Sequence, residues 1–116
     1  MNKYIEKYWQ DKNRHPYILK CNDELAGFVL YRFNEENMNE IAEFFVLKKY
    51  RKIGAGTFMA NKMFDLYKGK WEVSTLIKNE ISQKFWRKTI KNFTNNDFEE
   101  KYVRDNSRLA FYFENK

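Results

Sequence analysis

The stretch that decides the fold is EFFVLKKYRKIGAGTFM, residues 43–59. It opens with four consecutive apolar residues, 44–47, as expected for a strand buried on both faces of a sheet. A basic turn follows, then glycines at 54 and 56, and then apolar residues at helical spacing. Glycines let backbone N–H groups approach a ligand without obstruction, and a helix N-terminus adds unpaired N–H groups and a positive dipole. The segment therefore predicts a site for an anion.

Outward from this segment, periodicity predicts the remaining elements. Residues 3–11 carry apolar side chains at helical spacing and predict a short helix. Strands are predicted at residues 17–20, 25–33, 40–47 and 71–77, a closing hairpin at 98–103 and 109–113, and helices at 56–69 and 81–90, the last capped by Asn79. This order predicts an α/β (α+β) fold with a mixed, mostly antiparallel sheet and flanking helices. We expect residues 1–116 to form a single domain.

Composition limits the classes of partner. Lys and Arg number 22 against 16 Asp and Glu, a net charge of +6 that suits an anionic partner. Most aromatic residues fall at core-like positions, so we do not expect a nucleic-acid-binding surface. Cys21 and His15 are the only residues of their types, which argues against a disulfide and a zinc site. No apolar run approaches the ~20 residues of a membrane span, so we expect a cytoplasmic protein with no membrane partner.

The segment also carries the pattern of a known family. Residues 51–56, Arg-x-x-Gly-x-Gly, resemble the (Arg/Gln)-x-x-Gly-x-(Gly/Ala) signature of the GNAT N-acetyltransferases. As in that family, a strand containing Val46 and an aromatic residue, Tyr50, precede the signature. Residues 79–86, Asn-x-x-Ser-x-x-Phe-Trp, are similar to the second motif of the family. The resemblance covers about residues 16–113 and implies the GNAT acyltransferase fold with acetyl-CoA as co-substrate and no metal.

In GNAT proteins the signature strand and the strand after the following helix splay apart, and exposed main-chain groups pair with the pantetheine arm. The resemblance implies these cofactor-binding residues: Phe44, Phe45 and Val46 for the arm; Arg51, Lys52, Ile53, Gly54, Ala55, Gly56 and Thr57 for the pyrophosphate; and Asn79. Other interpretations stay open. Residues 44–46 also suit a buried core, and Asn79 suits a helix N-cap. Three cations of the second motif either reach the 3′-phosphate or are simply solvated: Lys84, Arg87 and Lys88.

The chemistry of that family is direct attack of an amine on the thioester. Glu40 matches the position of a catalytic glutamate in some members, and Glu43 is the alternative. Strand alternation puts the two on opposite faces unless a bulge intervenes. The backbone N–H of Val46 or Phe45 is the candidate oxyanion donor. Trp86 stands where the family usually has a tyrosine acid, and an indole N–H cannot donate that proton.

We therefore expect an N-acetyltransferase that moves the acetyl group of acetyl-CoA to a primary amine of a small-molecule or peptide acceptor. Trp86 leaves open a catalytically idle acyl-CoA-binding module. Family members usually begin with a strand and two helices, whereas the sequence predicts about one helix before the strand at residue 17. This difference also predicts a homodimer in which the partner completes the acceptor wall.

Overall fold

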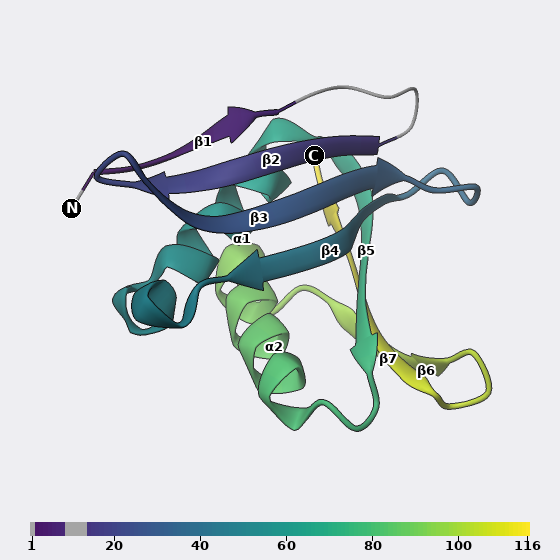
Figure 1. Cartoon of the computed structure of the whole chain (residues 1–116). Coiled ribbons are helices and arrows are strands. Elements are labelled where there is room, and N and C mark those ends of the chain that lie inside the picture. The colour runs from purple at the N-terminus through teal and green to yellow at the C-terminus, as the bar shows by residue number, and fades with distance from the viewer. Residues whose placement is uncertain (1, 9–13) are drawn as a thin grey trace.

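Seven strands form one sheet in the order β1-β2-β3-β4-β5-β7-β6. The structure is a computed structural model that describes residues 2–8 and 14–116. Its elements, shown in Figure 1, are β1 Lys3–Lys7, β2 Arg14–Cys21, β3 Glu24–Phe33, β4 Asn39–Val46, the 3-10 helix η1 Lys48–Ile53, α1 Ala55–Leu66, β5 Gly69–Leu76, α2 Glu80–Thr94, β6 Glu99–Val103 and β7 Arg108–Asn115. The fold is the mixed sheet with flanking helices that the sequence predicts.

The first element differs from its prediction. Residues 3–7 form β1 and not a helix, while residues 9–11 lie outside the described part of the chain. The strand runs antiparallel to β2, and Ile5 lies opposite Leu19, where it packs against the core. So short an isolated helix is marginal in water, whereas a strand on the edge of β2 gains a ladder of backbone hydrogen bonds. Pairing with β2 therefore overrides the helical spacing.

One junction in the sheet is parallel, and it is short. β4 and β5 pair only through Asn39 with Trp71 and Glu40 with Glu72, whereas the other neighbouring strands are antiparallel. Beyond these two pairs, β4 and β5 point in clearly different directions (Figure 1). The sheet therefore consists of a β1–β4 arm and a β5–β7–β6 arm that diverge from this junction.

A buried amide ties the two arms where they meet. Asn39 donates from Nδ2 to the carbonyl oxygens of Lys68, at 3.0 Å, and Lys70, at 3.1 Å. Its Oδ1 accepts a hydrogen bond from the Tyr31 hydroxyl. Burial raises the pKa of Tyr31 to about 12, so this phenol keeps its proton at neutral pH and remains a donor. The start of β5 is thereby fixed to β4.

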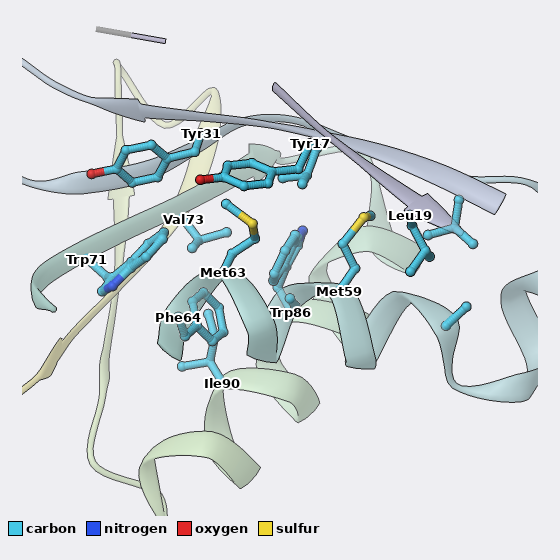
Figure 2. Packing of buried hydrophobic residues seen from close by; sticks show 14 of the residues in the cluster. Tyr17, Leu19, Tyr31, Met59, Met63, Phe64, Trp71, Val73, Trp86 and Ile90 are labelled. Carbon is cyan, nitrogen blue, oxygen red and sulfur yellow. The ribbon is translucent and has the colours of Figure 1, made fainter. Parts of the chain in front are cut away.

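Aromatic side chains hold both helices on the same face of the sheet (Figure 2). Trp71 of β5 is fully buried, with its ring 5.0 Å from that of Phe64 on α1 in an edge-to-face contact. Trp86 of α2 lies 4.7 Å from Phe44 of β4, between ring centroids. Burial of rings of this size dominates the energetics of a small core. We call the opposite side, which carries Leu30, Arg32, Glu43 and Phe45, the open face.

A bulge interrupts β4 in front of the apolar run. Leu30 lies opposite Glu43 and Tyr31 lies opposite Ile41, which leaves Ala42 without a partner on β3. Because directly opposed residues on neighbouring strands share a face, the extra residue reverses the alternation of side chains on β4. Phe44 and Ile41 therefore both face the helices.

Gly27 is the position where a single methyl group should disturb the β4 arm. A Cβ at residue 27 would lie 2.6 Å from the backbone oxygen of Phe45, and a backbone atom cannot move aside as a side chain can. We expect Gly27→Ala to lower the free energy of unfolding by about 2–3 kcal/mol, measured from urea denaturation curves. Gly54→Ala is the control, because its Cβ meets open space and only its φ of 79° is unfavourable, at about 1 kcal/mol. Equal losses in the two variants would contradict the expected clash.

Candidate active site

A cleft of about 600 Å³ occupies the space between the diverging arms. Its walls come from β4 on one side, β5 and β7 on the other, and the start of α2 below; they include residues 41–46, 73–76, 79, 81, 82, 85, 86 and 108, together with Arg51 and Gly56. Residues from both faces of the sheet contribute to it, such as Phe44 from the helix side and Glu43 from the open face. The cleft is therefore lined by side chains from both faces of the sheet.

The glycine-rich turn forms the N-terminus of α1 at one end of this cleft. Gly54 is the N-cap residue, with φ of 79°, and no side chain caps the helix. The Phe58 N–H donates to the Gly54 carbonyl at 3.0 Å and so makes the first backbone hydrogen bond of the helix. The N–H groups of residues 55–57 consequently have no acceptor within the helix, and the first turn contains no acidic residue. These properties suit an anion.

The predicted cofactor residues divide into two groups around the cleft. Six of them line it: Phe44, Phe45, Val46, Arg51, Gly56 and Asn79. The others belong to the turn and the helix start beside it: Lys52, Ile53, Gly54, Ala55 and Thr57. In this second group Ala55 is buried in the core, and the other four are exposed to solvent.

Arg51 folds back toward the strand that precedes it. Its Nε donates to the carbonyl oxygen of Val46 at 2.8 Å, and its guanidinium lies 5.8 Å from the ring centroid of Phe45. Arg51 thus stabilises the end of β4 while its positive charge stays at the cleft. The Val46 carbonyl oxygen therefore already accepts a hydrogen bond from within the protein.

The start of α2 combines a structural role with a place in the cleft. The Asn79 side-chain oxygen accepts a hydrogen bond from the Ser82 N–H at 3.0 Å, so the predicted N-cap is confirmed. Of the three cations proposed for the 3′-phosphate, Arg87 is bound instead to Glu100 of β6, at 2.8 and 2.9 Å. That pair lowers the pKa of Glu100 and raises that of Arg87. Lys84 and Lys88 are exposed and do not line the cleft.

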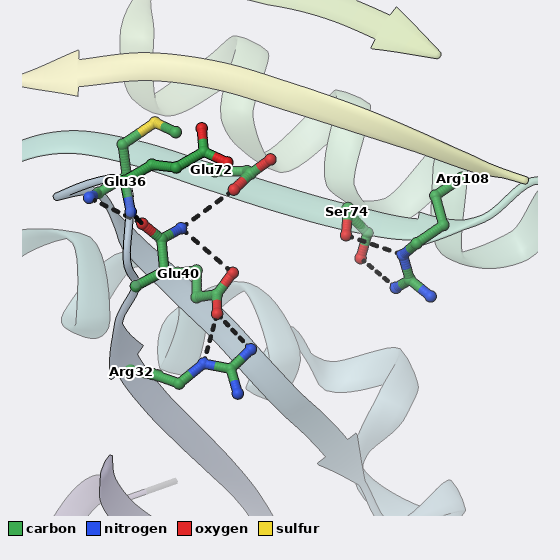
Figure 3. A network of polar contacts seen from close by, with 8 residues as sticks. Arg32, Glu36, Glu40, Glu72, Ser74 and Arg108 are labelled. Atoms are coloured by element: carbon green, nitrogen blue, oxygen red, sulfur yellow. Dashed lines mark hydrogen bonds and ion pairs between the residues drawn. The ribbon is translucent and has the colours of Figure 1, made fainter. Parts of the chain in front are cut away.

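The two candidate glutamates lie on the same face, which corrects the expectation from simple alternation. The bulge at Ala42 brings Glu43 to the open face, where Glu40 already lies opposite Arg32. Glu40 forms an ion pair with Arg32 and lies 3.4 Å from the Asn34 amide nitrogen (Figure 3). Glu43 is exposed, lines the cleft and has no ion-pair partner among the described residues. Of the two carboxylates, only Glu43 is both unpaired and in the cleft.

Polar contacts on the open face also link the two arms where they join. The Asn34 amide reaches Glu72 at 3.1 Å as well as Glu40, and the Tyr112 hydroxyl donates to Glu72 at 2.7 Å. Burial, followed by this hydrogen bond to Glu72, raises the pKa of Tyr112. Glu40 and Glu72 are therefore part of a structural network and not free groups.

Two cleft residues, Ser74 and Arg108, were not predicted from the sequence. The Arg108 Nε lies 3.0 Å from the Ser74 hydroxyl, and its Nη2 lies 3.2 Å from the Ser74 carbonyl oxygen. Arg108 comes directly before the predicted strand at 109–113, far along the chain from the GNAT signature. Alternation along that strand would indicate which face of the sheet carries Arg108, but not that Arg108 lies near β4.

The described residues hold neither a metal-binding cluster nor a membrane-spanning helix. In residues 2–8 and 14–116, no group of three or more His, Cys, Asp or Glu side chains is placed to hold a metal ion. Among the helices in those same ranges, none has the length and apolar composition needed to cross a membrane.

Comparison with solved structures finds the same fold in acetyltransferases that bind CoA. A proposed streptothricin acetyltransferase from Bacillus anthracis, in complex with acetyl coenzyme A, has a TM-score of 0.72 and 21% identity over 94% of this chain and 66% of its own. An acetyltransferase from Bacillus subtilis, in complex with CoA, has a TM-score of 0.72 and 15% identity over 97% of this chain and 99% of its own. The PaiA N-acetyltransferase from Thermoplasma acidophilum, in complex with coenzyme A, has a TM-score of 0.71 and 13% identity over 88% of this chain and 61% of its own. The chain thus spans less than two thirds of the first and third of these proteins.

Comparison of the sequence itself gives the family. None of the curated proteins matches the chain. The family description "Acetyltransferase (GNAT) family", by contrast, matches residues 1–90, which include the signature turn, the diverging strands β4 and β5 and the start of α2. The chain belongs to the GNAT family of acetyltransferases.

Proposed function

We propose that this protein is an N-acetyltransferase that transfers the acetyl group of acetyl-CoA to a primary amine. One observation carries the proposal. β4 and β5 separate after two residue pairs, and the cleft between them ends at an uncapped helix N-terminus. An extended thioester arm fits between two separated strands, and a diphosphate fits the unpaired N–H groups of residues 55–57. The CoA complexes among proteins of this fold support the same assignment.

Alternation of backbone hydrogen bonds indicates which main-chain groups of β4 meet the arm. The Leu47 N–H donates to the Ala26 carbonyl at 2.8 Å, toward the β3 side. In an antiparallel pair every second residue directs its N–H and C=O away from the partner strand. The N–H groups of Val46 and Phe44 are then directed to the cleft, whereas that of Phe45 is directed to β3. We assign the oxyanion donor to the Val46 N–H.

In the proposed reaction the acetyl thioester is the electrophile and the amine is the nucleophile. Glu43 accepts a proton from the ammonium form of the acceptor on the open face, which frees the nitrogen lone pair. The neutral amine attacks the carbonyl carbon of the thioester and forms the C–N bond, and the Val46 N–H stabilises the negative charge on the carbonyl oxygen of the tetrahedral intermediate. Collapse of this intermediate breaks the C–S bond and expels the CoA thiolate, and the nitrogen releases its second proton to solvent. The amide and CoA are the products.

Trp86 at the position of the usual acid is compatible with this reaction. Only 5% of its surface is exposed, and it packs on Phe44, so it acts as part of the cleft wall. Cysteine-like thiols have pKa values near 8.5, so a thiolate leaves readily near neutral pH and takes its proton from water. Trp86 nevertheless keeps the idle acyl-CoA-binding module as the second candidate.

One experiment with two stages separates these functions. Acetyl-CoA binding is measured first by calorimetry, and release of free thiol is then followed over a panel of primary amines. The proposed function predicts binding and amine-dependent thiol release. Binding without release for every amine would favour the idle module, and absence of binding would exclude both.

We also propose that a second copy covers part of the open face. Half of the Phe45 side chain is exposed there, beside Phe28 and Leu30 on β3. No helix within the described ranges covers this side of the sheet (Figure 1). Light scattering at high protein concentration should give the mass of a dimer, and a mass that stays monomeric would contradict the proposal.

A further inference from the structure

The reaction proposed above leaves one charged residue of the cleft without a role. Arg108 begins β7 and lines the cleft from the β5–β7–β6 arm. Ser74 anchors its Nε and one Nη2 hydrogen, and no carboxylate of the described residues forms an ion pair with it. A guanidinium has five N–H donors in a planar fork. The remaining donors of Arg108 are therefore available to an anion in the cleft.

Arg108 and Glu43 belong to the same face of the sheet. Glu72 lies opposite Glu40, which places it on the open face. Leu76, four residues after Glu72, projects to that same face and lies opposite Arg108 on β7. Figure 3 shows Arg108 farther along β5 than Glu72. Arg108 and Glu43, which carry opposite charges, thus line the cleft from the open face, each on a different arm.

From this pair we propose that the acceptor is an amine that also carries a carboxylate, and that Arg108 binds the carboxylate. The inference rests on the proposed acetyl transfer. The ammonium group of such a molecule lies at Glu43 on one arm, while its carboxylate meets the fork of Arg108 on the other. A diamine would instead bring its second positive charge against Arg108.

The other carboxylates of the open face do not reverse this preference. Glu40 is neutralised by Arg32, and Glu72 already accepts hydrogen bonds from Tyr112 and Asn34. Neither lines the cleft. The phosphates of the cofactor are a second source of anion for Arg108, and the experiment below separates the two sources.

The test compares glycine, β-alanine and γ-aminobutyrate with their carboxamides, at equal concentrations of neutral amine. We expect the unmodified protein to prefer at least one aminocarboxylate over its carboxamide in kcat/KM. Arg108→Gln should lower kcat/KM for that aminocarboxylate by about 10- to 100-fold while leaving the carboxamide rate and the acetyl-CoA affinity unchanged. A merely structural role of Arg108 would instead lower both rates together. Arg104→Gln is the matched control, since it removes the same charge from the same hairpin outside the cleft.

Calorimetry with the same acceptors on the CoA-loaded protein gives a readout that does not need turnover. Arg108-dependent binding of an aminocarboxylate supports the inference even if no acetylation follows, in which case only the proposed function fails. Acetylation of carboxamides or diamines as efficiently as aminocarboxylates overturns the inference and leaves the function intact. Weaker acetyl-CoA binding in Arg108→Gln, or no aminocarboxylate binding at all, also overturns it.

Discussion

Glu43→Gln should lower kcat by about 100-fold or more, because a positioned general base contributes roughly that factor. The substitution keeps the size of the side chain and removes its ability to accept the proton of the acceptor. Glu43 lines the cleft on the open face and has no ion-pair partner in the described part of the chain. The rate is measured as thiol release with the best amine. Acetyl-CoA affinity should stay unchanged, because the substitution alters neither the main-chain groups of β4 nor the start of α1, to which we assign the cofactor. The loss of kcat in Glu43→Gln should become smaller as pH rises, because the acceptor amine then loses its proton to solvent.

Glu40→Gln is the matched control for the same strand and face. Glu40 is held by Arg32 and Asn34 and does not line the cleft. Its substitution should cost about 0–1 kcal/mol of stability, as is usual for a partly exposed ion pair, with little change in kcat. A larger loss of kcat in Glu40→Gln than in Glu43→Gln would reverse our assignment of the base.

Thr57→Glu should weaken acetyl-CoA binding by about 100-fold while the protein folds at least as well as before. Thr57 is exposed in the first turn of α1, where a carboxylate interacts favourably with the helix dipole and unpaired N–H groups, by about 0.3–1 kcal/mol. The same charge repels a diphosphate at that helix N-terminus, and opposed like charges in an interface cost several kcal/mol. Calorimetric titration with acetyl-CoA and urea denaturation give the two quantities.

Thr57→Gln serves as control, because glutamine has the shape of glutamate without its charge. Its acetyl-CoA affinity should stay close to that of the unmodified protein. The difference in acetyl-CoA affinity between Thr57→Glu and Thr57→Gln should also decrease as salt is added, since screening weakens interactions between exposed charges. Equal affinities of the two variants at low salt would show that the diphosphate does not bind at the start of α1.

The sequence predicted most of this fold because its signals are local. The apolar run at 44–47, the glycines at 54 and 56 and the Asn79 cap each depend on neighbours within a few residues, and the structure confirms the strand, the helix start and the cap. The helix predicted at residues 3–11 was wrong over residues 3–7, because pairing with β2 depends on partners ten or more residues away. Such non-local pairing is not recorded in the periodicity of one segment.

Prediction of the cleft residues from the sequence has the same limit. Residues 44–46, Arg51 and Gly56 follow from the signature. Ser74 and Arg108 line the cleft only because the sheet order places β5 beside β4 and β7 beside β5. The common face of Glu40 and Glu43 depends on the pairing of Leu30 and Tyr31 across from Ala42. Nothing in the residues of β4 taken alone specifies that mismatch.

The bulge at Ala42 determines which side chains of β4 face the helices. If Ala42 took a regular paired position, the residues of β4 before it would be out of phase with those after it. Either Glu43 would then face the helices, or Ile41 would face solvent. Side chains along β4 can consequently be exchanged more freely than the bulge can be paired or moved.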